Sequence, residues 1–209
     1  MRDEMDTKWL DWSRRIQAIS QAGLHFSKDP YDQERYEELL LISAEIMNEY
    51  SNAGTEKIVD LYKNEKGYPT PKVDVRGVVF DKGKILMVCE SLDGKWSLPG
   101  GFCEIGLSAS DNAVKEIKEE AGLDVKPIKL LAVLDMNKHE HPVQPYHYYK
   151  LFIQCEICGG KPISGLETKE VGFFSEDQLP PLSLNRNTEK QIHMLFHLYK
   201  NQDYGAVFD

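Results

Sequence analysis

The sequence is poor in the features that mark secreted and membrane proteins. Four of its 209 residues are cysteines, and their spacing indicates no disulfide framework. No apolar run approaches the length of a membrane span. The N-terminal stretch MRDEMDTKWLDWSRR lacks the apolar core of a signal peptide. We therefore expect a cytoplasmic protein with no membrane association.

Positive charge is also scarce. The chain has 25 lysines and arginines against 34 acidic residues, which gives a formal net charge of −9. Long nucleic acids are bound through basic patches, so we expect no such partner. A small phosphorylated ligand remains compatible with this charge if a metal ion supplies the positive charge.

Residues 1–66 are expected to form a small all-α domain. Apolar residues recur there at intervals of three or four, which is typical of amphipathic helices. The segment SKDP interrupts the pattern, and Pro30 suits the first turn of a new helix. These stripes require burial against the rest of the chain or against a second copy, and we expect a homodimer. The stripes comprise Trp9, Trp12, Ile16 and Ile19, then Tyr36, Leu40, Ser43, Met47 and Tyr50, then Ile58, Leu61 and Tyr62.

Residues 67–209 are expected to form a second domain. The segment GYPTP at 67–71 ends the helical pattern, because glycine and proline stop helices. Strands are predicted near 72–80, 84–91, 127–135, 146–157 and 170–174, with helices over 109–121 and 187–200. Such a mixture predicts an α/β fold, an α/β/α sandwich with a mixed sheet.

The helix at 109–121 carries an unusual density of acid. Glu116, Glu119 and Glu120 fall on one side of it, and like charges at these spacings destabilise a helix. A solvated helix face would explain the cluster taken alone. Gly100 and Gly101 precede the helix, however, and glycines let a backbone approach a ligand closely. Clustered carboxylates beside such a loop suit Mg²⁺, which prefers oxygen ligands.

The segment GFCEIGLSASDNAVKEIKEEAGL, residues 101–123, resembles the signature of the Nudix hydrolases. That signature runs glycine, five residues, Glu, seven residues, Arg-Glu, two residues, Glu-Glu, one residue, Gly and an aliphatic residue. Two positions depart from it, since Leu107 stands at the first Glu and Lys115 at the Arg. Lysine keeps the charge but loses the planar fork of arginine. The positions in register are Gly101, Glu116, Glu119, Glu120, Gly122 and Leu123, with Gly100 and Glu104 also typical of the motif loop.

The N-terminal helices followed by YPTPKVDVRGVVF resemble a Nudix subgroup that carries an added helical domain. That subgroup includes Gram-positive CDP-choline pyrophosphatase and ADP-ribose pyrophosphatases. The resemblance implies hydrolysis of a nucleoside diphosphate linked to a group X, with Mg²⁺, or Mn²⁺ as a substitute, as cofactor. It implies Glu116 and Glu120 as metal ligands, Glu119 as a third ligand or a water-holding catalytic residue, and a backbone carbonyl at Gly100 or Gly101, preferably Gly101.

The resemblance also implies a carboxylate from outside the motif, as ligand or base. Glu170 is at the commonest location, with Glu167 and Glu140 as rivals. His139 and His141 lie in a polar loop, where they contact a substrate or are simply surface residues. Tyr148 either stacks on the substrate or belongs to the core. Arg186 reaches a terminal phosphate or is solvated.

Three functions follow from these observations. The first is a Mg²⁺-dependent Nudix pyrophosphohydrolase that acts on CDP-choline or ADP-ribose and releases a nucleoside monophosphate and X-phosphate. The second is a Nudix-fold nucleotide sensor without catalysis, which signals through its helices; such domains usually lose the motif carboxylates. The third is an interaction protein built on the helices, which would bind no nucleotide.

Overall fold

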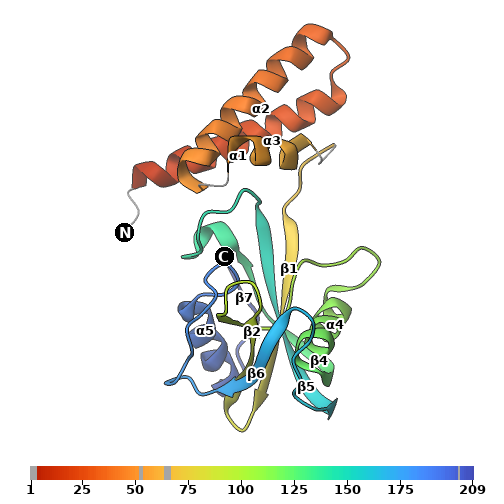
Figure 1. The fold of residues 1–209 in the computed structure, drawn as a ribbon, viewed down its shortest axis with the longest axis vertical. Helices are drawn as coiled ribbons and strands as arrows, with labels where there is room; N and C mark the ends of the chain where they lie inside the picture. The colour runs from red at the N-terminus through yellow and green to blue at the C-terminus, as the bar shows by residue number, and fades with distance from the viewer. Residues whose placement is uncertain (1–3, 52–53, 64–66, 202) are drawn as a thin grey trace. The chain divides into compact units, whose positions relative to one another are not determined.

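The computed structural model describes residues 4–51, 54–63, 67–201 and 203–209. The chain divides into two compact units, one of Met1–Pro71 with Val143–Tyr146 and one of Lys72–Pro142 with His147–Asp209 (Figure 1). We call them the helical unit and the hydrolase unit. The predicted boundary at 66/67 borders residues 64–66, which lie outside the described part of the chain. The structural division also places 67–71 and 143–146 with the helices.

The helical unit contains α1 (Glu4–Phe26), α2 (Pro30–Ser51) and α3 (Thr55–Lys63). The break between α1 and α2 falls at the predicted SKDP segment. Asp29 caps α2, because its Oδ1 accepts hydrogen bonds from the amides of Tyr31 (2.8 Å) and Asp32 (3.2 Å). Pro30 is the first residue of the helix, where its missing N–H has no cost.

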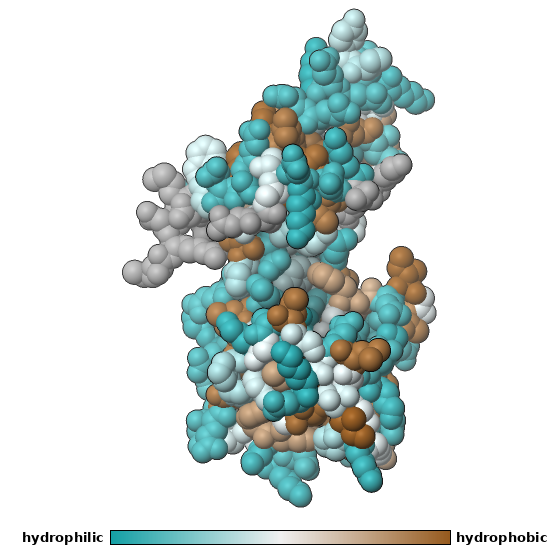
Figure 2. Space-filling model, in the orientation of Figure 1, coloured by the Kyte–Doolittle hydropathy of each residue, from teal (hydrophilic) through white to brown (hydrophobic). Residues whose placement is uncertain are grey.

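The core of the helical unit uses only some of the predicted stripes. It consists of Leu10, Leu40, Ala44, Met47, Ile58 and Tyr62. Burial of the first stripe within the chain is wrong, because Trp9, Trp12 and Ile19 are 42%, 44% and 61% exposed. Hydrophobic residues are visible at the surface of this unit in Figure 2. The other expectation, burial against a second copy, stays a prediction.

The hydrolase unit is built on one mixed sheet, and its described strands are seven. They are β1 (Lys72–Asp81), β2 (Lys84–Glu90), β3 (Trp96–Ser97), β4 (Leu123–Asp135), β5 (Tyr148–Gly160), β6 (Thr168–Phe174) and β7 (Val207–Phe208). Their order is β3-β2-β1-β5-β4-β7, with β6 paired to β2. The parallel pairs are β1 with β5 and β4 with β7. A two-residue turn joins β1 to β2, with positive φ at Lys82 and Gly83.

Two helices cover opposite faces of this sheet, α4 (Ala109–Ala121) and α5 (Glu189–Lys200). Successive strand residues alternate between them. Val79 packs in the cluster that contains α4, whereas Val78 packs in the cluster that contains α5. The predicted α/β/α sandwich with a mixed sheet is confirmed. Within the described residues, no helix combines the length and apolarity needed to cross a membrane.

Strand ends differ most from expectation. β4 begins at Leu123 rather than near 127, because Gly122 ends α4 with a φ of 73° and the chain enters the strand directly. β5 begins at Tyr148 and continues to Gly160, past the predicted end at 157. A short 3-10 helix, η1 (Met136–Lys138), follows β4.

Candidate active site

Helix α4 is fixed at both ends by its own sequence. Ser108 and Asp111 form a capping box at its start, with Ser108 Oγ accepting from the Asp111 amide at 3.1 Å. Ala113, Ile117 and Ala121 are fully buried against the sheet. The carboxylates of the helix consequently lie beside its contact with the sheet, and they differ strongly in their surroundings.

Glu120 is a buried carboxylate that faces the glycine loop. It is 7% exposed, and its Oε2 accepts a hydrogen bond from the Gly100 amide at 3.0 Å. Burial raises the pKa of Glu120 to about 8; nearby Glu90 and Glu116 add to this shift, while the Gly100 amide and the charge of Arg76 oppose it. The ionised form of Glu120 is therefore disfavoured at this point unless further positive charge is supplied.

The glycine loop has a backbone that only glycine fits. Gly100 has a φ of 143°, and a Cβ there would lie 2.0 Å from the Val75 carbonyl oxygen. The Gly101 carbonyl accepts a hydrogen bond from the Val75 amide at 2.8 Å. That oxygen, the preferred backbone metal ligand in the sequence prediction, is thus directed at β1. The Gly100 carbonyl, the other candidate, accepts no such bond among the described residues.

Glu116 is half-buried next to this loop. A Cβ on Gly101 would lie 3.4 Å from its Oε1. Burial raises the pKa of Glu116; the charges of Lys115 and Arg76 oppose this shift, and those of Glu119 and Glu167 add to it. The chain thus brings Glu116 and Glu120 to one side of the glycine loop.

Glu119 is exposed and paired with the lysine that replaces the motif arginine. Lys115 Nζ lies 2.7 Å from Glu119 Oε2 and 3.0 Å from Glu104 Oε1. These hydrogen bonds raise the pKa of Lys115. Leu107, at the position of the motif glutamate, is 42% exposed. Lys115 therefore takes its loop partner from Glu104, and the motif retains a cation between loop and helix.

No group of three His, Cys, Asp or Glu side chains in the described part of the chain is close enough to hold a metal ion. Glu119 is instead paired with Lys115. Glu116 and Glu120 nevertheless fit a hard divalent cation. They supply oxygen donors only, and their mutual repulsion in a buried place is what a cation would relieve.

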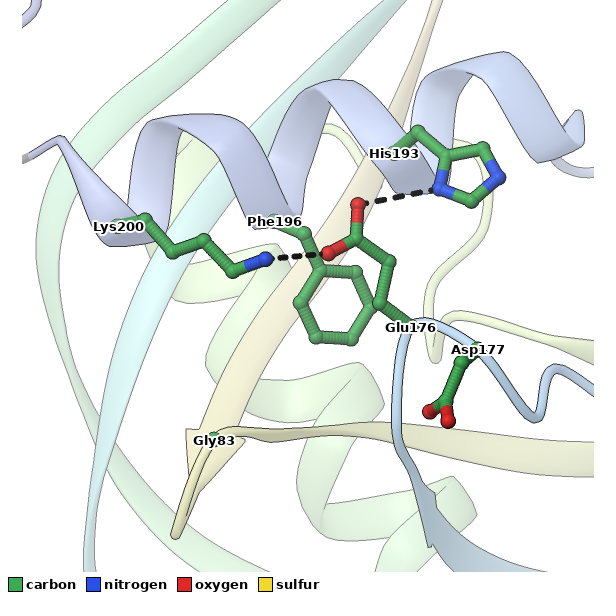
Figure 3. Close-up of a pocket in the computed structure, with 6 residues that line it drawn as sticks. All are labelled: Gly83, Glu176, Asp177, His193, Phe196 and Lys200. Atoms are coloured by element: carbon green, nitrogen blue, oxygen red, sulfur yellow. Dashed lines mark hydrogen bonds and ion pairs between the residues drawn. The ribbon is translucent and has the colours of Figure 1, made fainter.

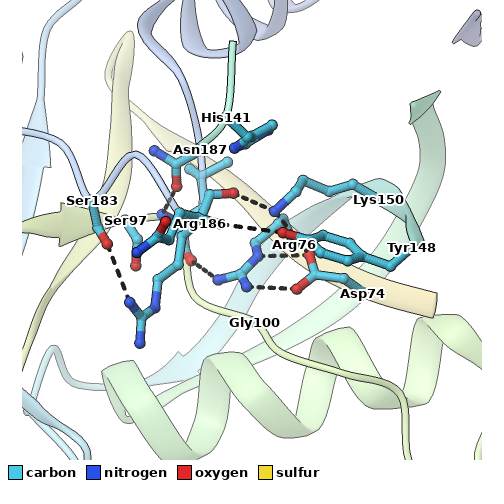
Figure 4. A network of polar contacts seen from close by, with 12 residues as sticks. Asp74, Arg76, Ser97, Gly100, His141, Tyr148, Lys150, Ser183, Arg186 and Asn187 are labelled. Atoms are coloured by element: carbon cyan, nitrogen blue, oxygen red, sulfur yellow. Dashed lines mark hydrogen bonds and ion pairs between the residues drawn. The ribbon is translucent and has the colours of Figure 1, made fainter. Parts of the chain in front are cut away.

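A buried polar network that sequence reasoning missed lies beside the carboxylates (Figure 4). Arg76 donates to both oxygens of Asp74, at 2.9 and 2.7 Å, and to the Leu98 carbonyl at 3.2 Å. Lys150 lies 3.3 Å from Asp74 and donates to the Arg186 carbonyl. Burial alone would raise the pKa of Asp74, but the charges of Arg76 and Lys150 lower it. The charged residues inside the apolar strands KVDVRGVVF and YKLF were the available signal.

Arg186 joins this network rather than standing free. Its Nε lies 2.8 Å from Glu90 Oε1, and its Nη1 donates to Ser183 Oγ at 3.1 Å. Its side chain is 24% exposed. Tyr148 is 5% exposed and packs edge-to-face against Phe102 in the motif loop. The structure thus places Tyr148, mostly in the core, against the motif loop, and Arg186 in the polar network.

The two predicted histidines are occupied elsewhere. His141 is 5% exposed; its Nδ1 donates to the Leu184 carbonyl at 2.8 Å, and its Nε2 accepts from Gln191 at 3.0 Å. Burial lowers its pKa to about 4, and the charge of Lys150 contributes. His139 pairs with Asp209 at 3.1 Å. Neither histidine is brought to the carboxylates of α4.

The structure also separates the three candidates for the outer carboxylate. Glu170 pairs with Cys89 across β6 and β2, and its neighbour Val171 packs in the α4 cluster. Strand alternation therefore places the Glu170 side chain on the face opposite α4. Glu140 pairs with Lys190 at 2.5 Å. The charge of Glu167 acts on Glu116, a motif carboxylate.

A separate hollow of about 560 Å³ lies between the β1–β2 turn and α5 (Figure 3). Glu176 bridges His193 and Lys200 across it, at 3.2 and 2.5 Å. None of the predicted site residues lines it. It is distinct from the place where the carboxylates and glycines meet.

A carboxylate-bearing helix beside a glycine loop on an α/β/α sandwich defines a hydrolase class, and sequence comparisons name it. Residues 70–196 match the profile of the NUDIX domain, and residues 7–62 match a profile described as a UDP-X-like, N-terminal oligomerisation domain. The chain belongs to the Nudix hydrolase family.

Three relatives are informative. A Bacillus subtilis (strain 168) protein, YjhB, provisionally named an ADP-ribose pyrophosphatase, is 58% identical over 99% of both chains. An ADP-ribose pyrophosphatase structure from Streptococcus suis 89-1591 is 44% identical, with a TM-score of 0.62; the match covers 67% of this chain and 100% of that one. A UDP-X diphosphatase structure is 36% identical, with a TM-score of 0.64, over 98% of this chain and 99% of that one.

The burial of His141 predicts acid sensitivity of the hydrolase unit. The unfolded chain protonates this residue near its ordinary pKa of 6.5, whereas the folded chain does so near 4. The contribution of neutral His141 to the free energy of unfolding is therefore fully present above pH 6.5 and is lost as the pH drops toward 4. The loss is on the order of 2 kcal/mol between about pH 7 and pH 5. The H141Q variant has no imidazole to protonate. Its free energy of unfolding should therefore fall over the same interval by about that much less than that of the protein with His141.

Urea unfolding followed by Trp96 fluorescence measures this difference. A W9F/W12F background leaves Trp96 as the remaining tryptophan of the three, so the signal reports the hydrolase unit. All other titrating groups are common to the two proteins and cancel in the comparison. Equal pH slopes with and without the H141Q substitution would contradict a neutral, buried imidazole.

Proposed function

We propose that this Nudix hydrolase cleaves the pyrophosphate of a nucleoside diphosphate linked to a group X, and releases a nucleoside monophosphate and X-phosphate. The observation that carries the proposal is the pairing of Glu116 and Glu120 beside Gly100, in a loop–helix whose register matches the family signature. ADP-ribose is the first candidate substrate, since two relatives carry the name ADP-ribose pyrophosphatase.

Two further substrates belong beside ADP-ribose. A UDP-linked sugar is supported by the UDP-X diphosphatase relative and by the UDP-X-like profile of the N-terminal residues. CDP-choline is supported by the subgroup resemblance alone. The alternative of a non-catalytic nucleotide sensor is not favoured, because all three motif carboxylates are present.

Glu116, Glu120 and the Gly100 carbonyl are the residues that we assign to a Mg²⁺ ion, with Mn²⁺ as a substitute. When bound, the cation neutralises charge on the pyrophosphate oxygens and positions or acidifies the attacking water. The Gly100 amide holds the Glu120 carboxylate beside the loop, and the charge of Arg76 favours its ionised form. Glu119 remains available as a third ligand or as a residue that holds water once its pair with Lys115 opens.

Arg186 is the side chain that we assign to a substrate phosphate. It is the partly exposed cation of the buried network, and its guanidinium retains donors beyond those used by Glu90 and Ser183. The exposed ring of Phe102, braced by Tyr148, offers an apolar surface to a base or sugar beside the same loop.

A second part of the proposal concerns assembly. We infer that residues 1–66 form a helical domain that mediates homodimerisation and that 67–209 form the catalytic domain. The exposed Trp9, Trp12 and Ile19 on α1 support this, as does the match of residues 7–62 to an oligomerisation domain. Apolar residues at these spacings on one helix offer a surface of the kind that a second copy buries.

A substrate panel with Mg²⁺ tests the proposed activity. ADP-ribose, a UDP-sugar and CDP-choline are each incubated with the protein, and a coupled phosphatase reports the phosphomonoesters released. The E120Q variant should lower kcat/KM by at least about 100-fold, because even residues behind metal ligands are worth 10–100-fold. E156Q, which removes an exposed glutamate on β5, is the matched control. Full metal-dependent turnover by E120Q would refute the ligand assignment.

A comparison of the E167Q and E170Q variants tests the identity of the general base. We assign this role to Glu167, so E167Q should lower kcat by about 100-fold or more with little change in KM. E170Q should retain activity within about threefold, because its side chain lies on the other face of the sheet. The reverse pattern would restore Glu170 to the role that the sequence resemblance gave it.

Light scattering tests the dimer. The wild-type protein should have twice the chain mass of 24.0 kDa at micromolar concentration. The W12D/I19D variant should be monomeric, because two charges would enter the apolar face. L92D places one such charge on an exposed leucine of the hydrolase unit and should remain dimeric. A monomeric wild-type protein, or a dimeric double variant, would contradict the assignment.

A further inference from the structure

The end of α4 that carries Glu119 and Glu120 is closed by a distant segment, residues 161–168, which we call the clamp. The last carbonyls of a helix have no partner within the helix. Here the Ala121 carbonyl accepts a hydrogen bond from the Ile163 amide at 3.0 Å. The Glu120 carbonyl accepts one from Thr168 Oγ1 at 2.8 Å. The clamp thus contacts the same residues whose side chains are assigned to the metal.

The backbone of the clamp lies in close contact with the last turn of α4 at Gly165. A Cβ on Gly165 would lie 1.9 Å from the Glu119 carbonyl oxygen. The Gly165 amide donates to Thr168 Oγ1 at 2.8 Å. The hydroxyl of Thr168, 5% exposed, therefore receives one hydrogen bond from the clamp and gives one to the helix. Its orientation is fixed by both.

The clamp is in turn anchored to the sheet. Thr168 is the first residue of β6 and pairs with Glu90 on β2. The Glu167 carbonyl accepts a hydrogen bond from the Ser91 amide at 2.9 Å. On the other side of the carboxylate, the Gly77 amide donates to the Pro99 carbonyl at 2.8 Å and ties the glycine loop to β1. Hydrogen bonds therefore attach both the last turn of α4 and the glycine loop to the same sheet.

We propose that Thr168 is a positioning residue, which sets the place of the Glu119 and Glu120 carboxylates relative to the Gly100 loop through its hydrogen bond to the Glu120 backbone. The inference rests on the proposed function, because it takes these carboxylates as metal-binding. A hydroxyl that merely stabilised the helix end would have no effect beyond stability. The N-cap residue Ser108 at the other end of the same helix separates the two roles.

The experiment measures binding of Mn²⁺ alone by electron paramagnetic resonance, together with kcat and KM on the best substrate of the panel. T168V removes the hydroxyl at nearly constant volume, and T168S restores it. We expect the Mn²⁺ dissociation constant of T168V to rise by about tenfold or more, as for other residues that orient ligands. T168S should lie within about twofold of wild type. S108A should also lie within about twofold although it lowers the melting temperature, because a cap at the far end supports the helix alone.

Several outcomes would overturn this inference. One is unchanged Mn²⁺ affinity in T168V, and another is an equal loss of affinity in S108A. If T168V is unfolded at the assay temperature, T168A is measured instead; it removes the hydroxyl together with the γ-methyl group, and the same expectation applies. A wild-type protein that binds no Mn²⁺ would instead overturn the metal assignment itself, and this inference with it.

Discussion

The site depends on one electrostatic constraint, the enclosure of the Glu120 carboxylate between α4 and the glycine loop. Burial makes a negative charge costly, and Glu90 and Glu116 add repulsion. The Gly100 amide and the guanidinium of Arg76 offset part of this cost. This balance leaves the carboxylate short of positive charge. The proposed cation would supply that charge, and the apolar contact between α4 and the sheet stabilises the arrangement.

Local signals explain why the motif helix was predictable. Ser108, Asp111 and Gly122 fix its ends through hydrogen bonds and a left-handed backbone within a few residues. The sandwich followed from strand and helix periods, and both helices that cover the sheet were found. The two-residue strands β3 and β7 were not predicted. The start of β4 also shifted, because the chain passes from Gly122 into β4 without a connecting loop.

Features that depend on contacts distant in sequence were not predictable in the same way. The network of Asp74, Arg76 and Lys150 forms where the parallel strands β1 and β5 meet. The role of outer carboxylate was assigned to Glu170 from its location in the chain, with Glu167 and Glu140 as rivals, and this assignment stays a prediction. The face of the sheet on which the Glu170 side chain lies depends on how β6 pairs with β2, where the register shifts between Cys89 and Glu90. No short-range pattern reports such a register.

The excursion of residues 143–146 has a consequence for how the chain can be divided. Val143 packs among the apolar residues of the helical unit, although the chain on both sides of it belongs to the hydrolase unit. The peptide backbone therefore passes from one unit to the other three times. A truncated protein that began at Lys72 would expose the apolar side chain of Val143 to water and leave this excursion without its packing. The two units are interleaved in sequence, so a cut at Lys72 separates residues 143–146 from the helices with which they are grouped.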